Sequence, residues 1–265
     1  MDWNKTKTYF IAVFLVLDLF LAVMFFNKFD ATRFEVIKAT SIEDKLKNDR
    51  IEYEKMPADA GELSIITAKP KTFSKSDFLF YTNQTIKIDS IDSNGTKIES
   101  VLDKPYETDG AMRDKMISFV KNNVLLGEQY SYWKRDREEK TVIFYQQYDD
   151  KKLFQNISGL VTLKLDDKDN IISYTQTMLS NIDEHTDEEA ILTAFQAIDA
   201  LYQNGLIQPD TEVANAELGY YTLVQLTESQ VLSPTWYFQL RKDGETKEFY
   251  VNAYNGSIYQ TEKES

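Results

Sequence analysis

Residues 160–179 read LVTLKLDDKDNIISYTQTML, and this stretch decides the class of the fold. Its two ends are rich in the β-branched and aromatic residues that favour strands, and they flank the polar run DDKDN. Asp and Asn favour turns because their short side chains bind nearby backbone groups. We therefore expect an antiparallel hairpin with its turn at Asp166–Asn170.

The residues before this hairpin predict one helix and two further strands. A helix is indicated over Thr108–Leu126, because its large apolar residues recur at helical spacing. Those residues are Met112, Met116, Phe119, Val120 and Val124. Gly127 follows and fits a helix C-cap. Strands are then expected at YSYWKR and KTVIFYQQY, between the helix and the hairpin.

The same order of elements recurs after the hairpin. The sequence TDEEAILTAFQAIDALYQNG, from Thr186 to Gly205, predicts a second helix in which Thr186 and Glu189 form a capping box. The buried face of that helix is expected to hold Ile191, Phe195, Ile198 and Leu201. Strands are then expected at ELGYYTLVQL, PTWYFQLRK, KEFYVNAY and SIYQT. Asn255-Gly256 predicts a hairpin turn between the last two.

This repeated order predicts an α+β fold in which a helix covers one face of each antiparallel sheet. Upstream, SIEDKLKN predicts a short helix, and ELSIIT, QTIKIDS and TKIESVL predict strands, the last two joined at Asn94-Gly95. We divide the chain into five predicted segments. They are a cytoplasmic tail at 1–7, a transmembrane helix at 8–26, a stalk with N-terminal strands at 27–104, a first helix-plus-sheet unit at 105–181 and a second unit at 182–265.

The N-terminal segment predicts a membrane anchor. Thr8–Phe26 reads TYFIAVFLVLDLFLAVMFF, nineteen residues with one charge. A helix of this length measures about 28 Å, close to the ~30 Å hydrocarbon core of a bilayer. The run ends in FFNKFD, which lacks the small residues of a cleavage site, so the anchor is expected to stay uncleaved. The short tail before it favours a cytoplasmic N-terminus and an extracytoplasmic C-terminal domain.

Asp18 stands near the middle of this apolar segment. A carboxyl group at the bilayer centre costs roughly 2.5–3.5 kcal/mol, so such residues usually face a partner or a polar cavity. We therefore predict that Asp18 contacts another transmembrane helix, with Phe14, Leu21 and Phe25 beside it at helical spacing. The alternative is that the apolar flanks merely tolerate the carboxyl group.

The charge of the chain argues against nucleic acid as a partner. The chain has 43 acidic and 30 basic residues, for a formal net charge of -13. A protein that binds nucleic acid needs a basic face to neutralise phosphates, and no basic run supplies one. Cys is absent, which excludes a disulfide, a thiolate nucleophile and a zinc site with Cys ligands.

Few residues suggest chemistry. The one histidine, His185, is expected to be exposed just before a helix cap. No nucleophile elbow, phosphate-binding loop or zinc-protease motif is present. With 43 acidic residues, some carboxylates will lie close together by chance, so a pair of them is a weak sign of a glycosidase-like site. The aromatic residues that alternate along the predicted strands, among them Tyr132, Trp133, Trp236, Tyr237 and Tyr250, are expected to form the core and cross-strand pairs.

Three stretches resemble the YycI regulatory protein family, also called WalI. They are the opening MDWNKTKTYFIAVFLVLDLFL, the segment GLVTLKLDDKDNIISYTQTML and the closing PTWYFQLRKDGETKEFYVNAYNGSIY, which is also similar to a PepSY-like hairpin. The resemblance covers the whole chain, and it depends on the order of short motifs together with one N-terminal span. It implies a YycH/PepSY-like fold.

The resemblance also implies a function. Members of this family are membrane-anchored accessory proteins that act with a YycH-like protein on WalK, the sensor histidine kinase of the WalK/WalR system of Gram-positive cell-wall control. We therefore expect a membrane-embedded, non-catalytic regulator whose partners are a WalK-like kinase and a YycH-like protein, with no cofactor and no metal. Two alternatives stay open, namely a PepSY-like inhibitor of an extracytoplasmic protease and an anchored cell-wall hydrolase.

Overall fold

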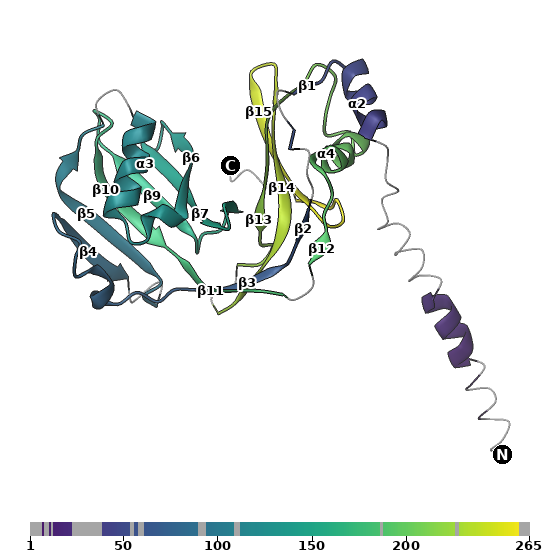
Figure 1. Cartoon of the computed structure of the whole chain (residues 1–265), viewed down its shortest axis with the longest axis horizontal. Helices are drawn as coiled ribbons and strands as arrows, with labels where there is room; N and C mark the ends of the chain where they lie inside the picture. Colours follow the sequence, from purple (N-terminus) through teal and green to yellow (C-terminus); the bar gives the residue numbers. More distant parts are fainter. Residues whose placement is uncertain are drawn as a thin grey trace.

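The computed structural model gives a mixed α+β protein dominated by one large sheet of fourteen strands (Figure 1). The described residues are 7, 11, 13–22, 39–53, 56–57, 61–89, 94–108, 112–185, 188–225 and 228–259. Within these ranges, none of the helices combines the length and the apolar character needed to span a membrane. The predicted span at 8–26 lies partly outside the described residues, as does most of the predicted tail at 1–7.

One half of the sheet carries helix α3 (Met112–Asn123) on one face, and we refer to it as the α3 half (Figure 1). Its strands follow the order β6-β7-β9-β10-β5-β4, and every neighbouring pair is antiparallel. Their bounds are β4 Gln84–Asp89, β5 Lys97–Tyr106, β6 Tyr130–Asp136, β7 Thr141–Tyr148, β9 Leu160–Leu165 and β10 Ile171–Thr177. Two 3-10 turns, η1 (Lys75–Phe78) and η2 (Gly127–Gln129), flank this half.

The other half, the α4 half, carries helices α2 (Ala39–Asn48) and α4 (Ala194–Gln203) (Figure 1). Its strands follow the order β1-β13-β14-β15-β16, antiparallel except for the parallel pair β1 and β13. Their bounds are β1 Glu52–Tyr53, β13 Glu212–Tyr221, β14 Gln230–Lys242, β15 Glu245–Asn252 and β16 Ile258–Tyr259. A separate two-stranded sheet joins β2 (Glu62–Leu63) to β12 (Glu189–Ala190).

Three further strands connect the halves. Strand β8 (Lys151–Phe154) pairs with β7 and also runs parallel to β13. Strand β3 (Ile66–Pro70) pairs with both β14 and β11 (Leu179–Glu184). From α2 onward, the chain therefore starts in the α4 half, passes through β3 into the α3 half, and returns through β11. The predicted boundaries at 104/105 and 181/182 stay predictions, although β5 pairs with β10 across the first of them.

The predicted helix at 108–126 is confirmed as α3, with shorter bounds. Met116, Phe119, Val120 and Val124 are buried, as their spacing predicts. The turn after the helix differs from the expected glycine cap, because the left-handed residue is Leu126, with φ of 50°. Gly127 is needed for space instead, since a Cβ atom there would lie 1.8 Å from the Val120 carbonyl oxygen.

The second predicted helix begins later than its capping box suggested, so that prediction is wrong. Glu189 lies in strand β12, and Thr186 is outside the described residues. The helix begins at Ala194, where the Thr193 hydroxyl accepts from the Gln196 amide and the Gln196 side chain accepts from the Thr193 amide. A second capping box, T-x-x-Q, was therefore the one used, because strand pairing with β2 occupies the residues before it.

The predicted turns are confirmed. Asn94 and Gly95 both have positive φ between β4 and β5, and Gly256 has φ of 70° between β15 and β16. In the turn from β9 to β10, the Asp166 carboxylate accepts hydrogen bonds from the amides of Lys168 and Asn170.

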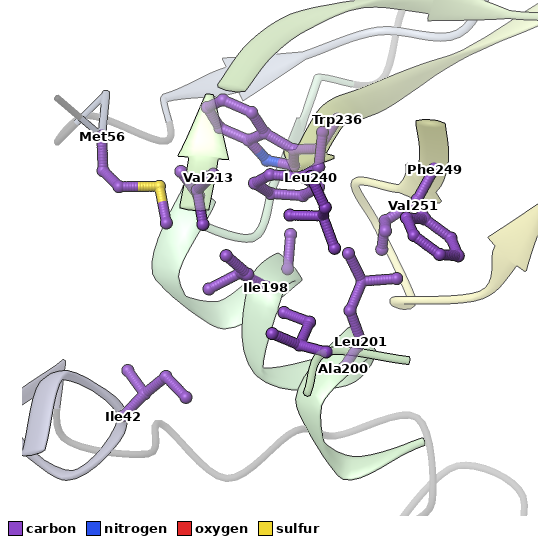
Figure 2. Close-up of a cluster of buried hydrophobic side chains, with 14 of the residues drawn as sticks. Ile42, Met56, Ile198, Ala200, Leu201, Val213, Trp236, Leu240, Phe249 and Val251 are labelled. Atoms are coloured by element: carbon purple, nitrogen blue, oxygen red, sulfur yellow. The ribbon is translucent and has the colours of Figure 1, made fainter. Parts of the chain in front are cut away.

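Each half has its own apolar core. In the α4 half, Ile198 and Leu201 of α4 are buried against the sheet that holds Trp236, and Figure 2 shows these side chains gathered between helix and strands. A third, aromatic cluster lies at the junction of the halves. There Trp133 of β6 contacts Tyr237 of β14, with ring centroids 4.7 Å apart. The expectation that the strand aromatics form core and cross-strand pairs is confirmed.

Candidate functional site

The predicted partner-binding residues lie in an N-terminal helical segment. Residues 13–22 are helical, and this stretch contains Phe14, Asp18 and Leu21. All three side chains are exposed, with 59% of Phe14 and 53% of Leu21 accessible. Phe25 lies outside the described residues. That these side chains contact another helix stays a prediction.

The geometry of this segment suits a helix–helix contact. Positions 14, 18 and 21 are related by i, i+4 and i+7, so they lie on one side of the helix. The neighbouring positions are exposed and apolar, from Val13 to Leu21. A single carboxyl group in such a surface can form one directional hydrogen bond in an otherwise non-directional contact.

The next described segment along the chain, residues 39–53, belongs to the α4 half, and we call it the strap. It consists of α2 and β1. Ile42, Leu46 and Ile51 of the strap are buried in the same core as Ile198 and Leu201 of α4. Strand β1 of the strap pairs with β13, and the Glu52 amide donates to the carbonyl of Thr211, the residue before β13.

Three side chains on one face of α4 contact the strap. They are Phe195, Asp199 and Tyr202, spaced i, i+4 and i+7. The Tyr53 ring meets Phe195 edge-on at 5.6 Å. The Tyr202 hydroxyl donates to the Asp49 carboxylate at 2.7 Å, and this hydrogen bond raises the pKa of Tyr202.

The third contact is an ion pair between Lys45 and Asp199. The Lys45 Nζ lies 3.3 Å from Asp199 Oδ1. Only 2% of the Asp199 side chain is exposed, against 40% for Lys45. The other oxygen, Oδ2, accepts from the Gln203 amide. The carboxylate is thus buried on α4, and its cation comes from the strap.

A second ion pair holds the end of the strap at the surface. Nε and Nη2 of Arg50 donate to the two carboxylate oxygens of Asp210, the second at 2.8 Å. The Arg50 guanidinium holds the pKa of the Asp210 carboxyl below its usual range. Because both side chains are more than half exposed, water screens this pair.

Two open grooves flank these contacts. One, of about 670 Å³, runs between α2 and β1 and is lined mainly by acidic side chains, namely Glu43, Asp44, Glu52 and Glu212. The other, of about 280 Å³, lies at the β14–β15 hairpin beside Arg241, Lys242 and Lys247. Some buried polar side-chain atoms in the described residues lack a hydrogen-bond partner, but none of them lines either groove.

Residues Tyr174 to Thr177 carry part of the family resemblance, and two of them donate hydrogen bonds to backbone carbonyls near the end of α3. The Tyr174 hydroxyl donates to the Asn123 carbonyl at 3.2 Å, and Gln176 donates to the Leu125 carbonyl at 2.7 Å. Asn123 is the last residue of α3 and Leu125 follows two residues later, at a helix end where carbonyls lack partners within the helix. This motif therefore holds α3 on the sheet.

The structure also shows where the single histidine lies. His185 is exposed after strand β11, and its amide donates to the Ile65 carbonyl at 2.9 Å. It therefore lies nine residues before α4 rather than next to the helix cap. Across the described residues, no three His, Cys, Asp or Glu side chains are grouped so as to hold a metal ion.

Sequence reasoning missed the strap contacts. Asp199 gave one usable signal, because it interrupts the apolar run AFQAIDALY on a helix whose neighbouring residues are buried. A buried carboxylate needs a cation. Which cation could not be predicted, since Lys45 lies 154 residues away in the sequence.

Comparisons with known proteins identify a family. The family described as "YycI protein" matches residues 32–254. Among solved structures, an uncharacterized protein from Eubacterium rectale is 12% identical, with a TM-score of 0.45 over 80% of this chain and 90% of that one. The Bacillus megaterium YpeB C-terminal domain is also 12% identical, with a TM-score of 0.42 over 71% of this chain and 94% of that one. None of the curated proteins matches.

Proposed function

Because this chain belongs to the YycI protein family, we propose that it is a membrane-anchored accessory regulator of a WalK-like sensor histidine kinase. Family membership supports a role in the WalK/WalR regulatory system at the level of the family. The family is one of regulatory accessory proteins and is not a known enzyme family. The specific partners, the anchor and the topology are parts of the proposal.

The observation that carries the proposal is the N-terminal segment with its single carboxyl group. Thr8–Phe26 has the length and composition of a membrane span, and the described part of it is helical. Phe14, Asp18 and Leu21 share one side of that helix. We propose that this side contacts the transmembrane helices of the kinase, because a lone carboxyl group in lipid favours a polar contact.

The proposed topology places the N-terminus in the cytoplasm and residues 27–265 outside the membrane. The extracytoplasmic part would bind a YycH-like protein through its two helix-plus-sheet units, at 105–181 and 182–265. Regulation requires the anchor to bind two packings of the kinase helices with different affinities, since a ligand shifts an equilibrium only by such a difference. The acidic charge of the chain agrees with a protein partner rather than a nucleic acid.

The test is a membrane pull-down of the tagged full-length chain beside Asp18→Leu and Asp18→Asn variants. We expect Asp18→Leu to recover several-fold less kinase, because it cannot form the hydrogen bond, whereas Asp18→Asn keeps most of the recovery. The amount of each variant in the membrane fraction is the control for insertion. Equal recovery by all three would remove Asp18 from the contact, and the absence of any kinase from the wild-type sample would overturn the proposal.

A further inference from the structure

The strap is short, and it is attached to the α4 half by three buried side chains, Ile42, Leu46 and Ile51, and by a few polar contacts. Helix α2 has ten residues, and isolated helices shorter than about 12–15 residues are marginal in water. Its outer face is exposed at Asp44, Lys47 and Asn48. Strand β1 adds only two residues of pairing with β13. The folded state of the strap therefore depends on its contact with α4.

The buried carboxylate of Asp199 makes that contact selective. Taking a carboxylate out of water is costly unless a cation compensates it. Within the part of the chain that the structure describes, the cation paired with Asp199 is Lys45 of the strap. Without the strap, Asp199 would lose this cation and would be exposed to water together with Phe195 and Tyr202, since all three lie on the face that the strap covers.

We propose that the strap is a releasable element, held closed on α4 by the buried side chains of Ile42, Leu46 and Ile51 together with the Lys45–Asp199 ion pair. In the closed state, α2 and β1 are fixed to α4 and β13. In the open state, residues 39–53 leave the α4 half, and the Phe195–Asp199–Tyr202 face becomes accessible. The strap is the next described segment after the N-terminal helix. Its two states would therefore couple the position of the anchor to the α4 half, and only this last step depends on the proposed function.

Release differs from unfolding, because it would expose Ile42, Leu46 and Ile51 while the contacts between α4 and the sheet stay in place. Leu201 of α4 and Trp236 and Phe238 of β14 are buried in this core and belong to elements other than the strap. Local openings of this kind occur at lower free energy than global unfolding. They are measured residue by residue through amide hydrogen exchange.

The experiment compares hydrogen exchange in full-length wild-type chain and in Lys45→Met, both in lipid nanodiscs. Loss of the cation leaves Asp199 buried and unpaired, so we expect exchange at Leu46, Ile51 and Glu52 to accelerate by about tenfold or more. Exchange in β14 and β15 should stay within about twofold of wild type. Lys47→Met is the matched control, because it makes the same change at an exposed position of α2.

A second variant tests whether the charge pair is the cause. Asp199→Asn replaces the carboxylate by a neutral amide that needs no cation. Combined with Lys45→Met, it should return strap exchange close to the wild-type rate. Unchanged strap exchange in Lys45→Met would overturn the role of the ion pair. Equal acceleration in the strap and in β14 would overturn release, because it would mean that the strap unfolds only with the whole half.

The result is independent of the kinase. Hydrogen exchange measures strap opening whether or not a kinase is captured, so failure of the proposed function leaves this measurement intact. The same variants in the membrane pull-down test the coupling itself. If strap exchange accelerates while kinase recovery stays at the wild-type level, the strap is releasable and its coupling to the anchor is overturned.

Discussion

At the scale of single residues, a buried amide fixes the point where the chain leaves the α3 half. Gln146 of β7 is almost fully buried, and it contacts both backbone groups of Leu179 at the start of β11. Its Nε2 donates to the Leu179 carbonyl at 2.9 Å, and its Oε1 accepts from the Leu179 amide at 2.7 Å. One side chain thus binds both backbone groups of a residue at the point where the chain passes from the α3 half to the α4 half.

Replacing Gln146 by Leu should lower the free energy of unfolding by about 3 kcal/mol, because two buried backbone groups at Leu179 would lose their partners. Urea unfolding followed by circular dichroism measures the change. The control is Gln147→Leu, since the Gln147 amide makes only an exposed 3.4 Å contact with Asp150. A loss below 1 kcal/mol for Gln146→Leu would mean that water replaces the amide.

The burial and turn positions of single residues were predictable where they depend on residues nearby in the sequence. The buried face of α3 follows from apolar spacing alone, and so do the turns at Asn94-Gly95 and Asp166. The contacts of Asp199 and Gln146 were not, because each one pairs a polar side chain with residues distant in the sequence. The partner of Asp18 stays a prediction for the same reason, since it would belong to another chain.

At the scale of elements, the sequence placed the strands well and some boundaries poorly. Strands β6, β7, β9 and β10 lie where β-branched and aromatic runs predicted them. Strand β8 was missed, because its four residues, KKLF, show no alternation. The start of α4 was placed too early because two capping boxes compete, and pairing between β12 and β2 decides between them.

Strand β8 depends on one glycine of its neighbour β13. A Cβ atom at Gly219 would lie 2.5 Å from the Lys152 carbonyl oxygen and 2.4 Å from the Phe154 ring. Gly219→Ala should therefore push β8 away from β13 and lower the free energy of unfolding by about 2 kcal/mol or more. Thermal unfolding measures this change. Asn215→Ala, at an exposed position of the same strand, should change little. Equal effects of both substitutions would contradict the close approach.

At the scale of the whole molecule, the two halves are joined by pairing and by aromatic packing. Strand β8 pairs with β13, and β3 bridges β11 and β14. At the junction of the halves, Trp133 contacts Tyr145 and Phe154 as well as Tyr237. The Lys152–Glu217 ion pair lies beside this cluster, with the Lys152 ammonium 5.9 Å from the Trp133 ring.

This arrangement could not be predicted from the order of the elements. The chain enters the α4 half at α2 and leaves for the α3 half after β3. It returns to the α4 half at β11. Sequence patterns show the period of each strand, yet the partner of each edge depends on long-range packing. The strap was accordingly assigned to a stalk, although it lies against a helix that comes about 150 residues later.

The aromatic cluster should make the two halves unfold together. Trp133→Ala removes the ring that contacts both halves. We expect this loss to lower the free energy of unfolding by about 3 kcal/mol and to separate the unfolding of the halves into two transitions. Hydrogen exchange at increasing urea concentration, read separately for β9 and β15, measures this separation. The matched control is Tyr132→Ala, whose ring contacts Phe144 within the α3 half and should weaken that half without removing contacts to the α4 half. Coincident transitions in Trp133→Ala would show that the strand pairing of β3 and β8 is enough to hold the halves together.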